Sequence, residues 1–120
     1  MPKLLIVDDE LDVREFAKNF FKRRKIEVTT AESGELALDA LSKDNFDLVI
    51  LDVRMGGIDG IETLRRLRQS GNKIDVIMVT GADDDETTSA AKNLGVVGYI
   101  HKPLILDELE KVVMQRLQKK

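Results

Sequence analysis

Three short segments of the chain are apolar at every position. They are residues 4–7, 48–51 and 76–79, which read Leu-Leu-Ile-Val, Leu-Val-Ile-Leu and Val-Ile-Met-Val. Continuous apolar runs of this length are typical of strands that are buried on both faces of a parallel sheet. Residues 26–30 instead alternate apolar and polar side chains, as a half-covered edge strand would, and residues 96–100 form a weaker fifth strand. The pattern therefore predicts five strands.

Between these strands, apolar side chains recur at the spacing of an amphipathic helix. The predicted stripes are Val13, Phe16, Ala17 and Phe20; Leu36, Ala37, Ala40 and Leu41; Ile61, Leu64 and Leu67; Thr87, Ala90, Ala91 and Leu94; and Leu109, Val112, Val113 and Leu117. Strict alternation of strand and helix implies right-handed crossovers that place helices on both faces of the sheet. Because the second strand reads as an edge, we predict an α/β fold with a flavodoxin-like, doubly wound, five-stranded parallel sheet, strand order 2-1-3-4-5, and five helices.

Composition narrows the class of protein. The chain has 120 residues, 42% of them hydrophobic, which fits a single domain over residues 1–120. Its net charge of -3 argues against direct binding to nucleic acid or to a membrane surface, and no segment is apolar for long enough to span a bilayer. The absence of cysteine and the single His101 exclude disulfides, thiol catalysis and Cys- or His-rich metal sites. We expect a cytoplasmic protein.

Polar side chains follow four of the predicted strands. Asp8, Asp9 and Glu10 come directly after the first strand, Asp52 after the third, Thr80 after the fourth and Lys102 after the fifth. In a doubly wound fold, ligands collect beyond the carboxyl ends of the strands, where the strand order reverses. We therefore expect these side chains to converge on one edge of the sheet.

The chemistry of this group favours a divalent cation and a phosphoryl group. Carboxylates brought together at the end of buried strands repel one another unless a cation pairs with them. Since the ligands are all oxygens, Mg²⁺ is the best match. Lys102 would supply a positive charge and Thr80 a hydroxyl for phosphoryl oxygens, which leaves one carboxylate to accept the phosphoryl group as a nucleophile.

A purely structural interpretation exists for each of these residues. Asp8, Asp9 and Glu10 could cap the next helix, and Asp52 could be a turn residue. Thr80 could be a strand-end hydroxyl, and Lys102 a solvated charge before Pro103 at a helix start. Taken together, these interpretations require four coincidences at one edge of the sheet.

At these positions the sequence resembles the receiver domain of two-component response regulators, and the resemblance covers essentially the whole chain. The segments that carry it are residues 5–10, 47–55 through Asp59-Gly60, 79–82 and 98–103. The resemblance implies that Asp52 is the phosphoacceptor. It also implies that Asp8 and Asp9 place Mg²⁺ together with Asp52 and the backbone carbonyl of Arg54.

The resemblance assigns the remaining site residues to a switch. Thr80 is then the hydroxyl that reaches for the phosphoryl group, Lys102 its salt-bridge partner, and Tyr99 the aromatic whose ring position reports the switch. A cis bond before Pro103 is also implied. The sequence departs from the family pattern at Gly56, at Ile105 and at Arg54, where a long cation stands beside the site. None of these departures removes a central residue.

The implied function is regulatory and not enzymatic, although the domain assists its own phosphorylation and dephosphorylation. A histidine kinase or a phosphotransfer protein donates the phosphoryl group from a phosphohistidine. The surface formed by the fourth helix, the fifth strand and the fifth helix then controls an output domain or partner protein, with homodimerisation on phosphorylation as a further option.

Two other functions use similar residues. A haloacid dehalogenase-type, Mg²⁺-dependent phosphatase also has a strand-end Asp nucleophile, but it requires a second Asp two residues later, where this chain has Arg54. A flavin-binding protein on the same fold would need an uncharged phosphate loop after the first strand. Asp8, Asp9 and Glu10 would repel that phosphate.

Overall fold

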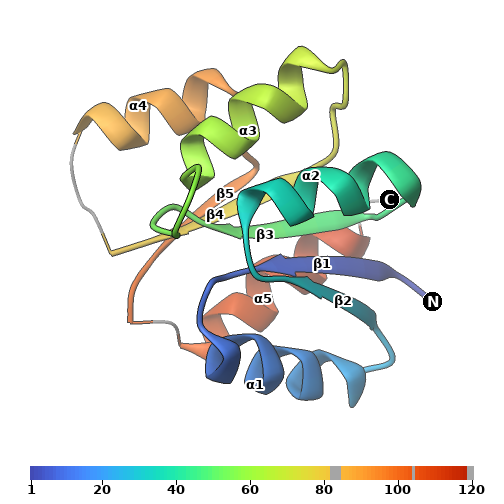
Figure 1. Ribbon diagram of the computed structural model, residues 1–120. Coiled ribbons are helices and arrows are strands. Elements are labelled where there is room, and N and C mark those ends of the chain that lie inside the picture. Colours follow the sequence, from blue (N-terminus) through green and yellow to red (C-terminus); the bar gives the residue numbers. More distant parts are fainter. Residues whose placement is uncertain (82–84, 104, 119–120) are drawn as a thin grey trace.

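The described strands form one parallel sheet in the order β2-β1-β3-β4-β5 (Figure 1). The structure is a computed structural model that describes residues 1–81, 85–103 and 105–118. The strands are β1 (Lys3–Val7), β2 (Glu27–Ala31), β3 (Leu48–Asp52), β4 (Val76–Thr80) and β5 (Gly98–His101). The predicted fold class and strand order are therefore confirmed.

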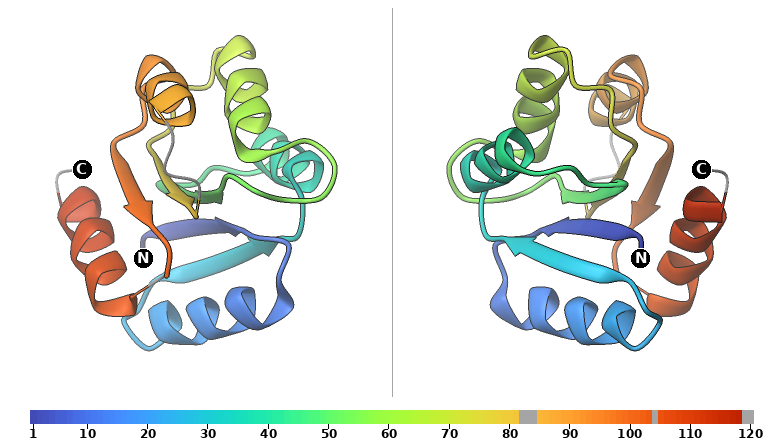
Figure 2. Two further views of the ribbon diagram at one scale, coloured as in Figure 1. Left: turned by 90° about the vertical axis from the view of Figure 1, so that its left-hand side faces the viewer. Right: turned by 90° about the vertical axis from the view of Figure 1, so that its right-hand side faces the viewer.

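A helix follows each strand, and the helices cover both faces of the sheet (Figure 2). They are α1 (Leu11–Lys22), α2 (Gly34–Lys43), α3 (Gly60–Gln69), α4 (Asp85–Asn93) and α5 (Leu106–Gln118). Helices α1 and α5 pack on one face of the sheet, and α2 and α3 pack on the other, where α4 lies beside α3. Among the helices of the described ranges, none has both the length and the apolar composition needed to cross a bilayer.

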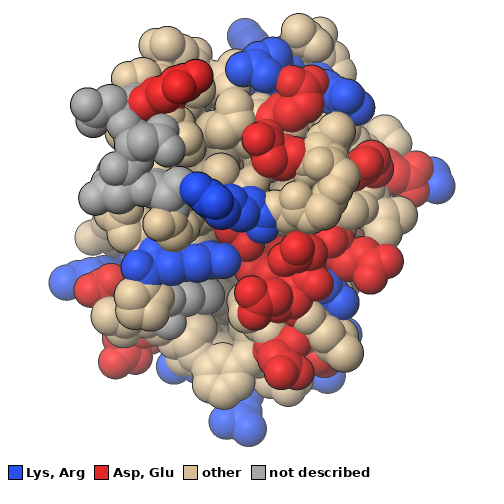
Figure 3. Space-filling model, turned by 60° about the vertical axis from the view of Figure 1, so that its left-hand side comes forward, with Lys and Arg blue, Asp and Glu red and all other residues tan. Residues whose placement is uncertain are grey.

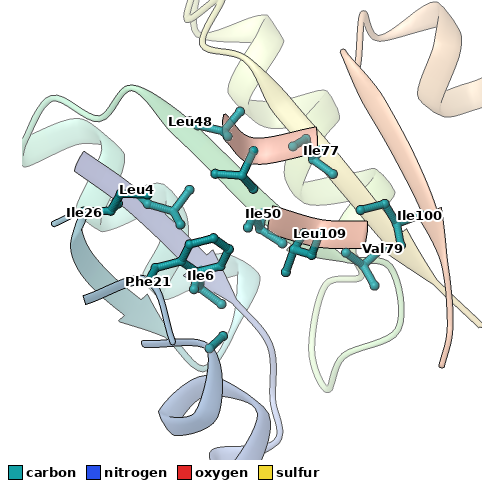
Figure 4. Close-up of a cluster of buried hydrophobic side chains, with 12 residues drawn as sticks. Leu4, Ile6, Phe21, Ile26, Leu48, Ile50, Ile77, Val79, Ile100 and Leu109 are labelled. Carbon is teal, nitrogen blue, oxygen red and sulfur yellow. The ribbon is translucent and has the colours of Figure 1, made fainter. Parts of the chain in front are cut away.

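The pleat of the central strands divides the core into two layers. Leu4 and Ile6 of β1 point to the α1 and α5 side, whereas Leu5 and Val7 point to the α2 and α3 side. All four are at most 3% exposed, which explains why β1 is apolar without alternation. Figure 4 shows the first layer, where Phe21 of α1 lies beside the strand side chains.

Two helical stripes differ from the prediction at one position each. Phe16 is 65% exposed, and the aromatic side chain that α1 buries against the sheet is Phe21. The inward face of α1 runs through Ala17 and Phe21, four residues apart, which turns Phe16 about 100° away from it. In the same way, Ala37 and Leu41 set the inward face of α2 and leave Leu36 48% exposed.

Two helices that position loops near the sheet edge begin with side-chain caps. The Ser33 hydroxyl accepts a hydrogen bond from the Leu36 N–H at α2, and the Asp59 carboxylate accepts one from the Glu62 N–H at α3. Such caps satisfy backbone donors that a helix start leaves without partners. They fix where the β2–α2 and β3–α3 loops end.

Candidate functional site

The predicted site residues meet at the carboxyl edge of the sheet. Asp52 and Thr80 are the last residues of β3 and β4, and Asp8 and Lys102 directly follow β1 and β5. Asp8, Asp52 and Thr80 are at most 5% exposed, so their polar groups lie at the boundary of the core. On the face shown in Figure 3, acidic side chains gather in one area and basic side chains lie beside them.

Lys102 and Asp52 form an ion pair across the edge. The Lys102 Nζ donates a hydrogen bond to Asp52 Oδ2 at 3.0 Å, and the Lys102 side chain is 32% exposed. Burial lowers the pKa of the Lys102 ammonium, but the hydrogen bond to Asp52 and the negative charges of Asp52, Asp8 and Glu10 outweigh it and raise the pKa overall. Lys102 is therefore held as a cation beside the Asp52 carboxylate.

Backbone contacts hold Lys102 and Asp52 at this edge. The Lys102 N–H donates to the Thr80 carbonyl at 2.7 Å, which continues the β4–β5 pairing beyond His101. The peptide bond between Lys102 and Pro103 is cis, as the resemblance implies. On the other side, the Val53 N–H donates to the Val79 carbonyl at 2.9 Å. The end of β3 is thus bound to the end of β4.

Asp8 is a buried carboxyl group with an unusual pKa. Burial raises the pKa of Asp8 to about 6, and the negative charge of Asp52 acts in the same direction. A hydrogen bond from the Glu10 N–H to Asp8 Oδ1, at 2.9 Å, opposes the increase. Without a cation, burying Asp8 beside Asp52 therefore disfavours the ionised form.

Asp8, Asp9 and Glu10 do not act as side-chain caps of α1. Glu10 occupies the N-cap position of α1, and its side chain makes no capping hydrogen bond. The Asp8 carboxylate instead bonds within the turn, to the N–H of Glu10. The acidic side chains are therefore not explained as helix caps.

The residues that could hold a metal form a compact oxygen cluster. Carboxylate oxygens of Asp8, Asp9 and Glu10 lie within 4.8 Å of one another, with Asp8 buried and the other two exposed. Hard oxygen donors at one open edge suit Mg²⁺, which keeps several of its waters. Asp52 adds a negative charge to this cluster. Its Oδ1 accepts a hydrogen bond from the backbone N–H of Arg54 at 3.4 Å.

From the sequence, Glu10 was expected at the edge but not among the metal ligands, and no role was expected for Arg14. The Arg14 Nη1 donates to the carbonyl of Asp8 at 2.8 Å, and its Nη2 lies 4.0 Å from Glu32. Through these two contacts the Arg14 side chain, which is only 12% exposed, connects the β1–α1 turn to the β2–α2 turn. An arginine one turn into a helix gives no signal in the sequence that it will fold back onto the preceding loop.

Tyr99 lies in β5 and packs against the α2 and α3 layer of the core. Its ring lies 5.3 Å from the His101 ring in an edge-to-face arrangement. The Tyr99 hydroxyl is buried and has no hydrogen-bond partner among the described residues. Tyr99 and Thr80 are on adjacent strands, where Thr80 pairs with His101.

A family comparison agrees with this arrangement. The model of the response regulator receiver domain matches residues 4–114. The chain belongs to this family. It is therefore the receiver domain of a two-component response regulator, as the resemblance implied, and neither a haloacid dehalogenase-type phosphatase nor a flavin-binding protein is indicated.

Curated relatives and solved structures resemble the receiver domain over nearly its full length. It is 34% identical to sporulation initiation phosphotransferase F of Bacillus subtilis (strain 168), over 96% of this chain and 93% of the relative. It is 35% identical to regulatory protein AtoC of Escherichia coli (strain K12), over 97% of this chain but only 25% of AtoC. The response regulator TrrA from Thermotoga maritima, solved in complex with Mg²⁺-BeF, aligns with a TM-score of 0.86 and 33% identity over 97% of this chain and 99% of TrrA.

Proposed function

We propose that the receiver domain accepts a phosphoryl group on Asp52 from the phosphohistidine of a histidine kinase or a phosphotransfer protein. The observation that carries this proposal is the Lys102–Asp52 ion pair at 3.0 Å, beside the Asp8, Asp9 and Glu10 cluster. A nucleophilic carboxylate, a lysine and a set of hard oxygen ligands are the groups that phosphoryl transfer requires. The complex of TrrA with Mg²⁺-BeF supports the same chemistry.

In the proposed step, an oxygen of Asp52 attacks the phosphorus atom. An oxygen–phosphorus bond forms, the nitrogen–phosphorus bond of the phosphohistidine breaks, and its electron pair returns to the imidazole. The Lys102 ammonium, held 3.0 Å from Asp52 Oδ2, is placed to pair with phosphoryl oxygens as negative charge accumulates on them. The domain thus contributes positioning and electrostatics to a reaction whose energy comes from its donor.

Mg²⁺ is the proposed cofactor, with Asp8, Asp9, Asp52 and the Arg54 carbonyl as its protein ligands. When bound, the ion offsets the repulsion between these carboxylates and an incoming phosphoryl group. Burial of Asp8 and its closeness to the Asp52 charge give the ion a site where negative charge is otherwise unfavourable. Glu10 lies in the same cluster and adds to its charge.

The proposed output is a change of surface. A phosphoryl dianion on Asp52 would attract the Thr80 hydroxyl, because charge-assisted hydrogen bonds are the stronger ones. Tyr99 on the adjacent strand would then change its ring position, which alters the face formed by α4, β5 and α5. Ile105, which precedes α5, is 49% exposed and supplies an apolar contact at this face, whereas Leu106 packs against the core and Leu104 lies outside the described residues.

On this proposal the domain is a regulatory switch and not an enzyme, even though it assists its own phosphorylation and dephosphorylation. The switch would act on an output domain, on a separate partner protein or on a second copy of this domain. Cytoplasmic location and a single domain over residues 1–120 stay predictions.

Intact-mass measurement tests the proposal. After incubation with acetyl phosphate and Mg²⁺, the wild-type chain should gain the mass of one phosphoryl group, and Asp52→Asn should gain none. Asp47→Asn is the matched control, because Asp47 precedes the same strand at its opposite end and should leave phosphorylation unchanged. Phosphorylation of Asp52→Asn at the wild-type rate would reject Asp52 as the acceptor.

A further inference from the structure

Arg68, in the last turn of α3, reaches the C-terminal end of α4, where the two helices lie side by side (Figure 1). Its Nε donates a hydrogen bond to the Leu94 carbonyl at 2.7 Å, and its Nη2 donates to the Gly95 carbonyl at 3.4 Å. Its Nη1 donates to the carbonyls of Asn72 and Ile74, at 3.1 and 2.8 Å. The guanidinium group therefore joins the loop after α4 to the loop before β4.

The acceptors of Arg68 give its guanidinium group a structural task. In the described structure its hydrogen bonds all go to backbone carbonyls, and none goes to a carboxylate. An arginine has five N–H donors in a planar fork, so one side chain can satisfy several carbonyls that a helix end leaves without partners. Its positive charge is also favourable beside the negative end of the α4 dipole. Arg68 thus holds the end of α4 against α3.

The other contacts of α4 are concentrated at the same end of the helix. The Val96 N–H donates back to the Ala91 carbonyl at 3.3 Å, across a turn in which Gly95 has a φ of 78°. Among the side chains described for α4, at positions 86–93, only that of Ala91 is buried. The described side chains nearer the N-terminal end are half-buried or exposed. The C-terminal end of α4 is therefore its better-held end.

Helix α3, which carries Arg68, is itself fixed to the sheet. At its start the Gly60 N–H donates to the Val53 carbonyl at 2.7 Å, directly after β3. Along its length Leu64 and Leu67 are buried in the core layer that α3 shares with α2. The C-terminal end of α4 is thus connected through α3 to the strand that carries Asp52.

We propose that Arg68 fixes the C-terminal end of α4, and that α4 swings about this end when the domain switches. The swing rests on the proposed function, in which the Thr80 hydroxyl moves towards a phosphoryl group on Asp52. Because α4 follows β4, and β4 ends at Thr80, the N-terminal end of α4 lies at the edge where the switch begins. A helix that is held at one end moves most at the other. A local change at the sheet edge then rotates α4 and does not displace it as a whole.

Amide exchange in the unphosphorylated full chain tests the fixed end, and it needs neither Mg²⁺ nor a phosphoryl group. Arg68→Ala should speed the exchange of the Leu94 and Val96 amides at least about tenfold, because it removes the hydrogen bonds that hold this loop closed. Guanidinium ion at tens of millimolar should restore part of the protection, whereas methylammonium, with its donors on one nitrogen, should not. Arg65→Ala is the matched control and should leave both rates unchanged, because Arg65 lies on the same helix and bonds only to Glu62 in the described structure. Wild-type exchange rates at both amides in Arg68→Ala would overturn the proposal.

Distances between spin labels test the swing with Arg68 intact, so this measurement decides even if Arg68→Ala does not fold. The chain has no cysteine, and labels can therefore be placed with the pairs Asp39→Cys/Glu86→Cys and Asp39→Cys/Asn93→Cys. All three positions are exposed, one on α2 and two near the opposite ends of α4. Mg²⁺ and beryllofluoride should change the distance between positions 39 and 86 and leave that between positions 39 and 93 unchanged.

Fluorine NMR of the bound beryllofluoride separates the two proposals. With beryllofluoride bound, an equal change of both distances, or no change of either, overturns the swing of α4 but not phosphoryl transfer to Asp52. Absence of a bound signal overturns the proposed function and the swing with it, whereas the amide exchange of Arg68→Ala decides the fixed end in either case.

Discussion

Gly60, the first residue of α3, lies against the backbone of Asp52. A β carbon on Gly60 would overlap the Asp52 carbonyl oxygen and would come within 2.8 Å of the Val53 Cα. The Gly60 N–H also donates to the Val53 carbonyl at 2.7 Å. The start of α3 is therefore docked on the end of β3, directly behind the proposed phosphoacceptor.

Gly60→Ala should destabilise the domain by about 1–3 kcal/mol, since the added methyl group overpacks against rigid backbone. Urea unfolding followed by circular dichroism measures this loss. Gly56→Ala is the control, because a β carbon on Gly56 meets no atom within 4 Å, and its stability should stay within about 0.5 kcal/mol of wild type. Equal stability of the two variants would contradict the close docking.

Arg14 should matter for metal binding without being a metal ligand. Arg14→Ala removes the donor to the Asp8 carbonyl and frees the β1–α1 turn, so the affinity for Mg²⁺ should fall several-fold. Isothermal titration with Mg²⁺ measures the change, and Arg23→Ala, at the exposed end of α1, is the control. Partial recovery in Arg14→Lys would agree with a positioning role, whereas unchanged affinity in Arg14→Ala would exclude one.

The stability of the Mg²⁺-free domain should depend on Asp8 between about pH 4 and pH 7. Its pKa is raised from 3.8 to about 6 by burial, so the folded state holds this proton more tightly than the unfolded chain does. The stability due to protonated Asp8 is full below pH 4 and is lost as the pH rises through 6. The wild type should therefore melt at a lower temperature at pH 7.5 than at pH 5, beyond any change seen in Asp8→Asn.

Saturating Mg²⁺ should reverse this trend, because the ion binds the ionised carboxylate and competes with the proton. The increase in melting temperature on adding Mg²⁺ should be larger at pH 7.5 than at pH 5. Identical pH profiles for wild type and Asp8→Asn would show that Asp8 titrates at its ordinary pKa.

Tyr99→Phe should stabilise the unphosphorylated domain slightly or leave its stability unchanged. The Tyr99 hydroxyl is buried without a hydrogen-bond partner among the described residues, and such a group costs about 1–3 kcal/mol. Thermal unfolding compares the variant with wild type. A loss of more than about 1 kcal/mol would reveal a hydrogen bond that the hydroxyl makes in solution.

Activation by beryllofluoride, which mimics the phosphoryl group on Asp52, should change amide exchange along one face. We expect changes from Thr80 through α4 and β5 to the start of α5, because Thr80 and Tyr99 connect this face to the sheet edge. Sedimentation under the same conditions reports whether the domain dimerises. Changes confined to α1 or α2 would show that the signal leaves by another face.

The sheet and the residues at its edge could be predicted from the sequence alone. Runs such as residues 48–51 are apolar at every position because both sides of a central strand are covered, so they predicted the central strands. The alternating residues 26–30 indicated an edge strand, and this gave the strand order. Once the strands were placed, Asp52 and Lys102 had to meet, since all parallel strands end at the same edge.

The rotation of each helix, and the side chains that support the site, depended on tertiary packing. The helical period placed Phe16 and Phe20 on the predicted stripe and left out Phe21, whereas in the structure Phe21 is fully buried with Ala17 and Phe16 is exposed. Three features bring together residues that are distant in the sequence or separated by a turn. They are the contact of Arg14 with the Asp8 carbonyl, the close approach of Gly60 to Asp52, and a cavity beneath Asp8. Such contacts depend on complementary shapes across elements, which no local pattern of residues encodes.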